Sequence, residues 1–459
     1  MDFSLAKLAS VLRAAPAEDA PLSGVAVDSR RVRPGDLFVA IPGAWVDGHD
    51  FALQAAAAGA RAVLAQRIPI GLPRGFPVVL VSDTRRALLE FAGVLRREAG
   101  FRLAAIGGSA GKTTTKDMTA AILGHKFATE KTPGNQNSAI GFPMSVVNLT
   151  RWPEWMVGEM GMSAVGEISL LSRTFEPDAA CITLIAAEHL EFLGSLDNVA
   201  KANGEILEGL KPSGVFVVND DDARVSALAD AFSGTKLRFG RTAFADVTVE
   251  NVEDLGSESR LRLRAHSGSA EIRLPLPGAH QVSNFLAASA LAIACGADPA
   301  DCAAAAPELK AAAHRGEIQF HPSGAVLYDD AYNASPPSMR AALDTLSRME
   351  ATRKIAVLGD MLELGPEESW FHRETGRYAR GRAHDLVCVG PRARVIAEGA
   401  LEEGFDPDHI RVVGTPEEAA ALLTGTLEEG VTILFKASRG VGLERAVLAL
   451  MGRPSRGTR

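Results

Sequence analysis

Short apolar segments alternate with helical ones through the middle of the chain. Arg102–Gly107 is apolar and predicts a strand, and a glycine-rich turn separates it from a helix expected at about Lys112–Gly124. The same alternation continues in strands and helices expected at 155–160, 180–185, 197–210, 214–218 and 221–231. Strands that alternate with helices favour a parallel, doubly wound sheet.

The pattern then changes and restarts. Polar and apolar residues alternate over 245–274, which predicts a small antiparallel sheet, and a helix at Asn284–Cys295 closes the unit. From about residue 310 the alternation of strands and helices begins again and predicts a second doubly wound unit. Its strands are expected at 325–328, 354–358, 385–389 and 431–435, with helices beginning near Pro336, Glu367, Arg392, Pro416 and Leu443.

The start of the chain combines short apolar stretches with turns rich in proline and glycine. Gly24–Asp28 predicts a strand, and a turn at 33–36 precedes a second apolar stretch at Leu37–Ile41. Phe51–Gly59 predicts a helix that ends at its glycine, and 83–99 predicts a longer helix. We therefore expect three domains, at 1–82, 83–309 and 310–459.

Composition narrows the class of protein. Of the 459 residues, 47% are hydrophobic and 23% charged, as in globular domains. The formal net charge is −8 with no basic block, so we expect no nucleic-acid partner. Four scattered cysteines fit a reducing compartment and give no zinc spacing. Because no apolar stretch approaches about 20 residues and the first residues lack a signal-peptide pattern, we expect a cytoplasmic protein without membrane insertion.

A phosphate-binding loop is the strongest chemical signal. Residues 107–115 read GGSAGKTTT between the predicted strand and helix. Glycines let the backbone curl around phosphate oxygens, the helix N-terminus directs amides at the anion, the lysine adds charge and a threonine offers a hydroxyl to Mg²⁺. Ile106 stands where the full Walker pattern has its first glycine, and an ordinary glycine turn is the alternative. We expect ATP or GTP to bind Gly108, Ser109, Ala110, Gly111, Lys112, Thr113 and Thr114.

The expected fold class is α/β with three domains. A small N-terminal α/β domain precedes a central doubly wound P-loop ATPase-like domain and a C-terminal doubly wound Rossmann-like domain.

Several blocks occur in a fixed order along the chain. They are GSAGKTTTKD at 108–117, TPGNQNSAIGFP at 132–143, EMGMSAVGEI at 159–168, HLEFLGS at 189–195, YDDAYNASPPSMRAA at 328–342 and GDMLELG at 359–365. With these blocks the whole chain resembles the Mur ligases, the ATP-dependent amide-forming enzymes of peptidoglycan precursor synthesis. The resemblance is nearest to the branch that adds D-alanyl-D-alanine to UDP-N-acetylmuramoyl-tripeptide. It implies these two substrates, ATP and Mg²⁺; we also expect a monomer.

Two residues outside the phosphate loop are candidate metal ligands. Glu159 and His189 each follow a predicted strand, at the edge where ligands of open α/β sheets bind. Carboxylate and imidazole can hold a divalent ion, although a surface glutamate and a loop histidine explain the pattern equally well. The resemblance implies that Glu159, His189 and Thr113 form the Mg²⁺ environment.

Asn203 departs from the pattern of the family. The resemblance places a carbamylated lysine, which supports a second metal ion, at this position of an A-K-x-E-I stretch, and the chain reads Ala202-Asn203-Gly204-Glu205-Ile206. Lys201 lies roughly 200° around the helix and cannot replace it. Asn203 offers a carbonyl oxygen without charge, so we expect a weaker second metal site. With Lys112, Glu159 and His189 it completes the candidate catalytic set.

Candidate substrate residues come from two parts of the chain. By resemblance, Ser29 and Arg30 hold the UDP portion. Thr132, Asn135 and Asn137 are short polar residues in a Pro/Gly loop that can hydrogen-bond a sugar or peptide. Ordinary turns explain both stretches nearly as well.

The remaining candidates lie further along the chain. Asn284 belongs to a stretch that resembles the adenine side of the family site, with Gln281 where the family usually has asparagine. Arg315 could bind phosphate across the domain boundary, although an ordinary surface arginine is the simpler explanation. The resemblance implies that the C-terminal loops close over ATP and admit the amine. Their candidate residues are Asp330 and Asn333, then Lys436, Ser438 and Arg439.

The expected reaction is an ATP-dependent ligation. An amide does not form spontaneously from carboxylate and amine in water, so the carboxylate is first activated as an acyl phosphate, chemistry that rests on positioning and electrostatics. The alternatives are a Mur-family ligase of different amino-acid specificity and a P-loop protein that binds ATP without ligating.

Overall fold

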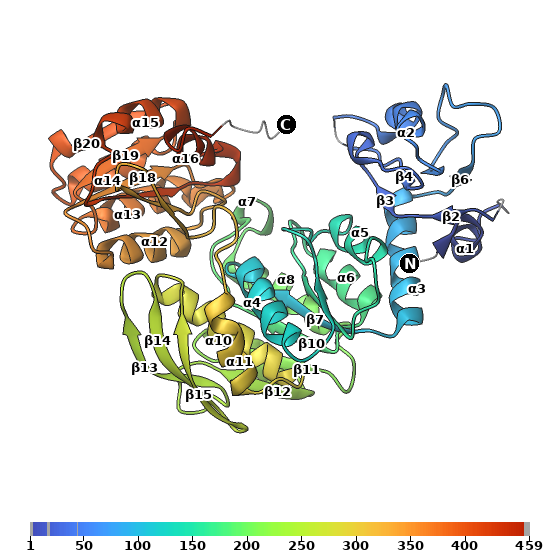
Figure 1. Cartoon of the computed structure of the whole chain (residues 1–459), viewed down its shortest axis with the longest axis horizontal. Coiled ribbons are helices and arrows are strands. Elements are labelled where there is room, and N and C mark those ends of the chain that lie inside the picture. The colour runs from blue at the N-terminus through green and yellow to red at the C-terminus, as the bar shows by residue number, and fades with distance from the viewer. Residues whose placement is uncertain (1–2, 16–18, 44, 454–459) are drawn as a thin grey trace.

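The structure is a computed structural model that describes residues 3–15, 19–43 and 45–453. Figure 1 shows three α/β units, with the first and the last at opposite ends of the molecule and the central one between them. This architecture confirms the expected fold class. Within the described ranges, no helix is long and apolar enough to cross a bilayer.

A small parallel sheet in the order β3-β4-β5-β6 forms the first unit. Its strand at Gly24–Asp28 is shorter than predicted, because the Asp28 carboxylate accepts the Arg30 N–H and caps a 3-10 turn at Ser29–Arg31. The elements are β1 (Phe3–Ser4), α1 (Leu5–Val11), β2 (Pro21–Leu22), β3 (Val25–Ala26), β4 (Leu37–Val39), α2 (Ala52–Ala57), β5 (Ala62–Ala65) and β6 (Val78–Leu80).

Helix α3 (Thr84–Ala99) joins the first unit to the central one. Asp83 caps its start by accepting two backbone N–H groups, and Gly100 ends it with φ +68°. The helix packs against α1 and against α5 (Gly141–Val147) and α6 (Glu167–Phe175) of the central unit. Its buried side chains belong to one apolar core that extends from the N-terminal strands into the central sheet.

Six parallel strands form the central sheet in the order β12-β11-β10-β7-β9-β8. The strands are β7 (Arg102–Gly107), β8 (Thr129–Lys131), β9 (Trp155–Glu159), β10 (Ala179–Ile182), β11 (Val215–Asn219) and β12 (Thr235–Phe239). The helices are α4 (Lys112–Gly124), α7 (Leu190–Leu193), α8 (Leu196–Gly204) and α9 (Ala223–Ala231). Strand β7 lies between β9 and β10, so the loop after it leaves the sheet at the switch point where α/β folds bind ligands.

A three-stranded antiparallel sheet follows, as expected, with β13 (Thr248–Asp254), β14 (Ser259–Ala265) and β15 (Gly268–Leu274). Helices α10 (Ala279–Ala294) and α11 (Pro299–Ala305) complete the unit. The start expected for the closing helix, at Asn284, is wrong. Helix α10 begins at Ala279, after Gly278 turns the chain with φ +97°.

The C-terminal sheet has the order β16-β17-β21-β18-β19-β20, and only β16 is antiparallel to its neighbour. Its strands are β16 (Glu317–Phe320), β17 (Val326–Asp329), β18 (Arg353–Gly359), β19 (Asp385–Val389), β20 (Ile410–Val413) and β21 (Val431–Lys436). Its helices are α12 (Pro336–Arg348), α13 (Glu368–Ala379), α14 (Arg394–Glu402), α15 (Pro416–Leu423) and α16 (Glu444–Leu450). Alternate residues of β18 enter two separate cores, Ala356 on one face and Val357 on the other.

Candidate nucleotide and substrate site

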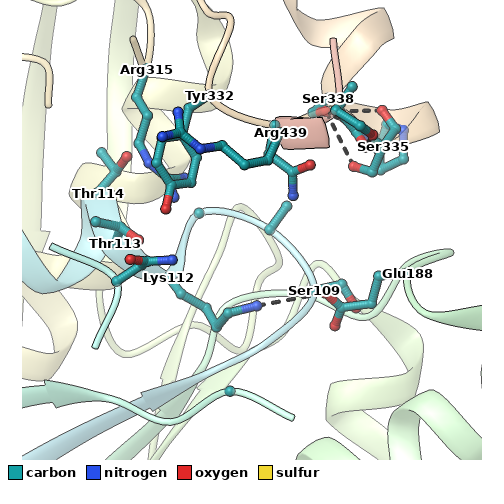
Figure 2. A pocket seen from close by; sticks show the side chains of 18 of the residues that line it. Ser109, Lys112, Thr113, Thr114, Glu188, Arg315, Tyr332, Ser335, Ser338 and Arg439 are labelled. Carbon is teal, nitrogen blue, oxygen red and sulfur yellow. Dashed lines mark hydrogen bonds and ion pairs between the residues drawn. The ribbon is translucent and has the colours of Figure 1, made fainter. Parts of the chain in front are cut away.

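A cavity of about 560 Å³ lies between the carboxyl edge of the central sheet and the first loops of the C-terminal unit. Figure 2 shows side chains from both units facing this space. Most of the sequence-predicted site residues line it: Ser109, Ala110, Gly111, Lys112, Thr113, Thr114, Asn135, Asn137, Glu159, His189, Asn284, Arg315, Asp330, Asn333, Lys436, Ser438 and Arg439. Gly108, Thr132 and Asn203 do not line it, but Asn203 hydrogen-bonds to Gly108 of the phosphate loop and Thr132 hydrogen-bonds to Glu159.

The phosphate loop requires glycine at two points. Gly108 has φ +119°, and a Cβ there would lie 2.1 Å from Thr183 Oγ1. Gly111 has φ +81°, and a Cβ there would lie 2.3 Å from Asn284 Oδ1. The Thr183 hydroxyl donates to the Ala110 carbonyl at 2.6 Å, which holds the loop in shape. The loop therefore delivers the N-terminus of α4 to the cavity in a fixed conformation.

Lys112 extends across the loop. Its Nζ donates to the Gly108 carbonyl at 2.5 Å and lies 3.6 Å from Glu188 Oε2. Figure 2 shows the lysine extending toward Glu188. A role for Lys112 in binding phosphate stays a prediction. Glu188 was not predicted as a site residue, because its place beside Lys112 depends on the fold of the loop after β10.

Asn203 supports the phosphate loop from below. Its side chain is buried, its Oδ1 accepts the Gly108 N–H at 2.7 Å, and its Nδ2 donates to the Val199 carbonyl at 3.0 Å. The oxygen that was expected to face a metal ion therefore holds the backbone of the loop. A direct role for Asn203 in catalysis stays a prediction.

Glu159 is a buried carboxylate at the end of β9. Its Oε1 accepts from Asn137 Nδ2 at 2.9 Å, whereas its Oε2 has no hydrogen-bond partner within the described chain. Thr132 lies behind it, and Thr113 lines the same cavity from the first turn of α4. A buried carboxylate oxygen without a donor is suited to a cation, so these residues fit a divalent ion.

A buried lysine lies beside this carboxylate. Lys116 donates from Nζ to the backbone carbonyls of Thr132 and Gly134 at 2.9 and 2.5 Å. Burial lowers the pKa of Lys116, while Asp117 and Glu159 act in the opposite direction. The lysine therefore fixes the Thr132–Gly134 turn from which Asn135 and Asn137 extend toward the cavity.

His189 precedes α7 in a left-handed conformation, with φ +49°. Its Nδ1 lies 2.5 Å from Glu363 Oε2, a carboxylate of the C-terminal unit. Glu363 lies in the block at 359–365 but was not among the predicted site residues.

The first turns of α10 provide the adenine-side candidates. Asn284 Nδ2 donates to Gln281 Oε1 at 3.3 Å, and Asn284 lies against Gly111 of the phosphate loop. His280 also lines the cavity, and its buried Nδ1 has no hydrogen-bond partner among the described residues. Burial lowers the pKa of His280. His280 was not among the predicted site residues.

The C-terminal side of the cavity consists of paired charges and a stacked tyrosine. Arg315 lies 3.9 Å from the centroid of the Tyr332 ring, and Arg439 lies 5.2 Å from it. Lys436 is buried and donates from Nζ to Asp330 Oδ2 at 2.5 Å and to the Asn333 carbonyl at 3.0 Å. Tyr332 therefore stacks between two arginines, one from the segment before β16 and one from the loop after β21.

Ser438 closes this wall. Its Oγ accepts the Leu362 N–H at 2.9 Å and donates to the Ala334 carbonyl at 3.4 Å. The hydroxyl therefore ties the loop after β18 to the loops after β17 and β21.

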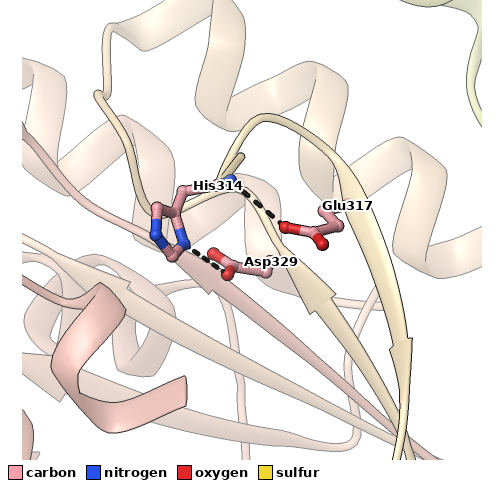
Figure 3. Close-up of side chains that lie close together, drawn as sticks. All are labelled: His314, Glu317 and Asp329. Carbon is pink, nitrogen blue, oxygen red and sulfur yellow. Dashed lines mark hydrogen bonds and ion pairs between the residues drawn. The ribbon is translucent and has the colours of Figure 1, made fainter. Parts of the chain in front are cut away.

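A histidine and two carboxylates lie close together where the chain passes from the central unit to the C-terminal unit (Figure 3). His314 Nδ1 lies 2.6 Å from Asp329 Oδ2, and the His314 N–H donates to Glu317 Oε2 at 3.5 Å. The hydrogen bond with buried Asp329 raises the pKa of His314. This cluster fixes the backbone just before Arg315.

Ser29 and Arg30 lie in the first unit, outside this cavity. The buried Ser29 hydroxyl donates to Gln54 Oε1 at 2.9 Å, and exposed Arg30 pairs with Asp28 at 2.9 Å. Nearby, the His49 N–H and the Arg67 guanidinium hold the pKa of Asp47 well below its usual range. A role for Ser29 and Arg30 in binding the UDP portion stays a prediction.

Family models match three successive parts of the chain. The Mur ligase family catalytic domain matches residues 21–91, the Mur ligase middle domain 106–292 and the Mur ligase glutamate ligase domain 314–439. A Bacillus subtilis protein named UDP-N-acetylmuramoyl-tripeptide–D-alanyl-D-alanine ligase is 38% identical over 439 residues, which cover 95% of each chain.

Solved structures agree. The crystal structure of MurF from Acinetobacter baumannii superposes with a TM-score of 0.88 at 29% identity and 99% coverage of both chains. MurF from Thermotoga maritima, solved in complex with ADP, gives 0.81 at 28% identity, covering 94% of this chain and 97% of that one.

Proposed function

The chain belongs to the Mur ligase family, and we propose that it joins D-alanyl-D-alanine to UDP-N-acetylmuramoyl-tripeptide at the expense of ATP, in peptidoglycan precursor synthesis. The observation that carries the proposal is the shared cavity in which the phosphate loop of one unit faces the Lys436 and Arg315 loops of another. The printed names of its relatives supply the substrates.

Each unit takes one part of the reaction. Residues 1–82 hold the UDP-sugar through Ser29 and Arg30, residues 83–309 bind ATP, and residues 310–459 receive the amine. The loops at the carboxyl edges of the parallel strands support this division, because such loops can change without disturbing the core.

The chemistry proceeds in two displacements. A peptide carboxylate oxygen attacks the γ-phosphorus, the bond to the β,γ-bridging oxygen breaks, and ADP leaves. The amine of the dipeptide then attacks the acyl carbon, loses a proton, and expels inorganic phosphate. Lys112 and the amides at the start of α4 stabilise charge on the transferring group, and Arg315 binds phosphate from the opposite wall.

Glu159, Thr113 and His189 would hold Mg²⁺. When bound, such an ion neutralises phosphate charge. The buried, donor-free Oε2 of Glu159 supports this assignment. Asn137 keeps the other carboxylate oxygen in place, so the orientation of Glu159 is set before any ligand binds.

The amine substrate meets the C-terminal wall. Asp330 and Asn333 contact Lys436 in the structure, and all three line the cavity with Ser438 and Arg439. An incoming dipeptide brings an ammonium and a carboxylate, which suit Asp330 and Arg439 respectively.

Phosphate release tests the proposal. Purified protein is incubated with ATP, Mg²⁺, UDP-N-acetylmuramoyl-tripeptide and D-alanyl-D-alanine, and each is omitted in turn. Release that requires all four, with a UDP-pentapeptide detected by mass, is the expected result. Release that ignores the dipeptide, or accepts a single amino acid instead, would contradict it.

Two further properties belong to the same proposal. The protein acts in the cytoplasm. Its free, buried cysteines support this location, because disulfides are rare in a reducing compartment. It acts as a monomer; a mass measured by light scattering at twice the chain mass would contradict this.

A further inference from the structure

Strained backbone gathers where the central and C-terminal units meet. Of the six non-glycine residues with positive φ in the described part of the chain, three lie at this junction: His189, His314 and Glu363. Residues with side chains persist in this conformation only where their surroundings hold them, and such positions often mark functional sites. His314 lies on the covalent crossing, whereas His189 and Glu363 face each other from different units.

The contact between His189 and Glu363 is built from several parts. The imidazole Nδ1 lies 2.5 Å from Glu363 Oε2, and the Glu191 N–H donates to the Glu363 carbonyl at 3.3 Å. Gly365 lets the two backbones approach, because a Cβ there would lie 3.3 Å from the Glu191 nitrogen. Helix α7 packs directly on this loop. Side-chain and backbone contacts together therefore hold both left-handed residues.

This contact fixes which imidazole nitrogen is free. An ionised carboxylate accepts hydrogen bonds, so Nδ1 carries the proton in the neutral ring and Nε2 keeps its lone pair. His189 and Glu363 both line the ligand cavity. Carboxylates that orient metal-binding histidines in this way are frequent in metal sites and affect metal affinity.

We infer that Glu363 is a positioning residue, which orients His189 so that Nε2 faces the cation site and does so only while the C-terminal unit is docked. The inference rests on the proposed function, because it assumes the cation site of Glu159, Thr113 and His189. Asn137 orients Glu159 from within the central unit, whereas Glu363 orients His189 from the other unit. Cation affinity therefore depends on the position of the C-terminal unit.

Binding of Mn²⁺ with ADP tests the inference without turnover. Free Mn²⁺ is titrated by electron paramagnetic resonance against the wild type and Glu363→Ala, both saturated with ADP. We expect Glu363→Ala to weaken Mn²⁺ binding by about tenfold. Glu363→Gln keeps an oxygen acceptor and should lose less. The matched control is Glu367→Ala, which removes an exposed carboxylate from the same loop and should leave Mn²⁺ affinity unchanged.

The outcomes separate the two proposals. If the wild type with ADP binds no Mn²⁺, the cation site is wrong and the inference falls with it. If the wild type binds Mn²⁺ and Glu363→Ala binds it equally well, only the inference is overturned. A changed X-ray scattering profile of Glu363→Ala with unchanged Mn²⁺ affinity would likewise overturn it, because Glu363 would then hold the domains together without acting on the metal site.

Discussion

The two walls of the cavity are built in different ways. On the central side, glycines, buried Asn203 and the Thr183 hydroxyl hold the phosphate loop by contacts within its own unit. On the C-terminal side, charged groups are held by one another, as in the pair of Lys436 with Asp330. The loop backbone of the central wall is therefore shaped before ligands bind, whereas charged groups of the C-terminal wall must exchange partners when substrates arrive.

The largest expected effect comes from removing the positive charge of Lys112 from the central wall. Lys112→Ala removes the ammonium group that we propose to contact phosphate in place of the loop. The rate of phosphate release should therefore fall by about 10³-fold. The measurement is substrate-dependent phosphate release at saturating ATP. Lys201→Ala, on the exposed face of α8, is the control and should keep wild-type activity. Activity of Lys112→Ala near that of the control would remove the phosphate loop from the mechanism.

A substitution in the C-terminal wall should lower the stability of the fold. Asp330→Asn leaves buried Lys436 without its charged partner, although the amide oxygen and the Asn333 carbonyl still accept from it. We expect the free energy of unfolding to fall by roughly 2 kcal/mol. Urea denaturation measures it.

A surface pair provides the comparison for Asp330→Asn. Glu417→Gln breaks the exposed pair with Arg445 and should change stability by less than about 0.5 kcal/mol. Equal effects of the two variants would show that burial of Lys436 does not matter.

Asn203→Ala should disturb the central wall from behind. The Gly108 N–H loses its buried acceptor, which costs about 1–2 kcal/mol of stability and loosens the loop. Calorimetric titration should show weaker ADP binding. Asn203→Asp keeps an acceptor and should retain more affinity; if both variants bind ADP as the wild type does, Asn203 does not support the loop.

The smallest effect depends on pH. The folded-state pKa of His314 is raised, chiefly by its hydrogen bond to Asp329, with Glu317 and Glu444 adding to the shift. A raised pKa stabilises the fold fully below the unfolded value near 6.5, and this contribution disappears as the pH rises through the folded pKa. The stability difference between wild type and His314→Asn should therefore be larger at pH 6 than at pH 9. A constant difference between the two pH values would contradict this prediction.

The sequence predicted the central wall better than the C-terminal one, for a physical reason. Strand β7 and helix α4 match their expected bounds, because an apolar strand, a glycine turn and a lysine are all local signals. Strand β8 was missed because Thr129–Lys131 is a short, polar edge strand. The start of helix α10 was predicted too late, because its first turns carry polar side chains such as His280 and Asn284. These side chains line the cavity and interrupt the apolar pattern.

Site residues follow the same rule. Lys112 and Thr113 were found from the phosphate loop alone, since strand, loop and helix adjoin in sequence. Glu363 contacts His189 of the other unit, 174 residues away in sequence, and no local pattern marks this pairing. The carbonyl oxygen of Asn203 was expected to face a metal ion, whereas in the structure it accepts the backbone N–H of Gly108, a contact that depends on the fold.

The core that runs along α3 has a consequence for how the molecule melts. Side chains of the N-terminal strands, of α3 and of one face of the central sheet form a single apolar cluster, while the C-terminal sheet has two clusters of its own. Groups that share a core lose their packing together. The three domains therefore form two cooperative units of unfolding. On heating, calorimetry should show the C-terminal third unfolding in one transition and the first two units unfolding together in another.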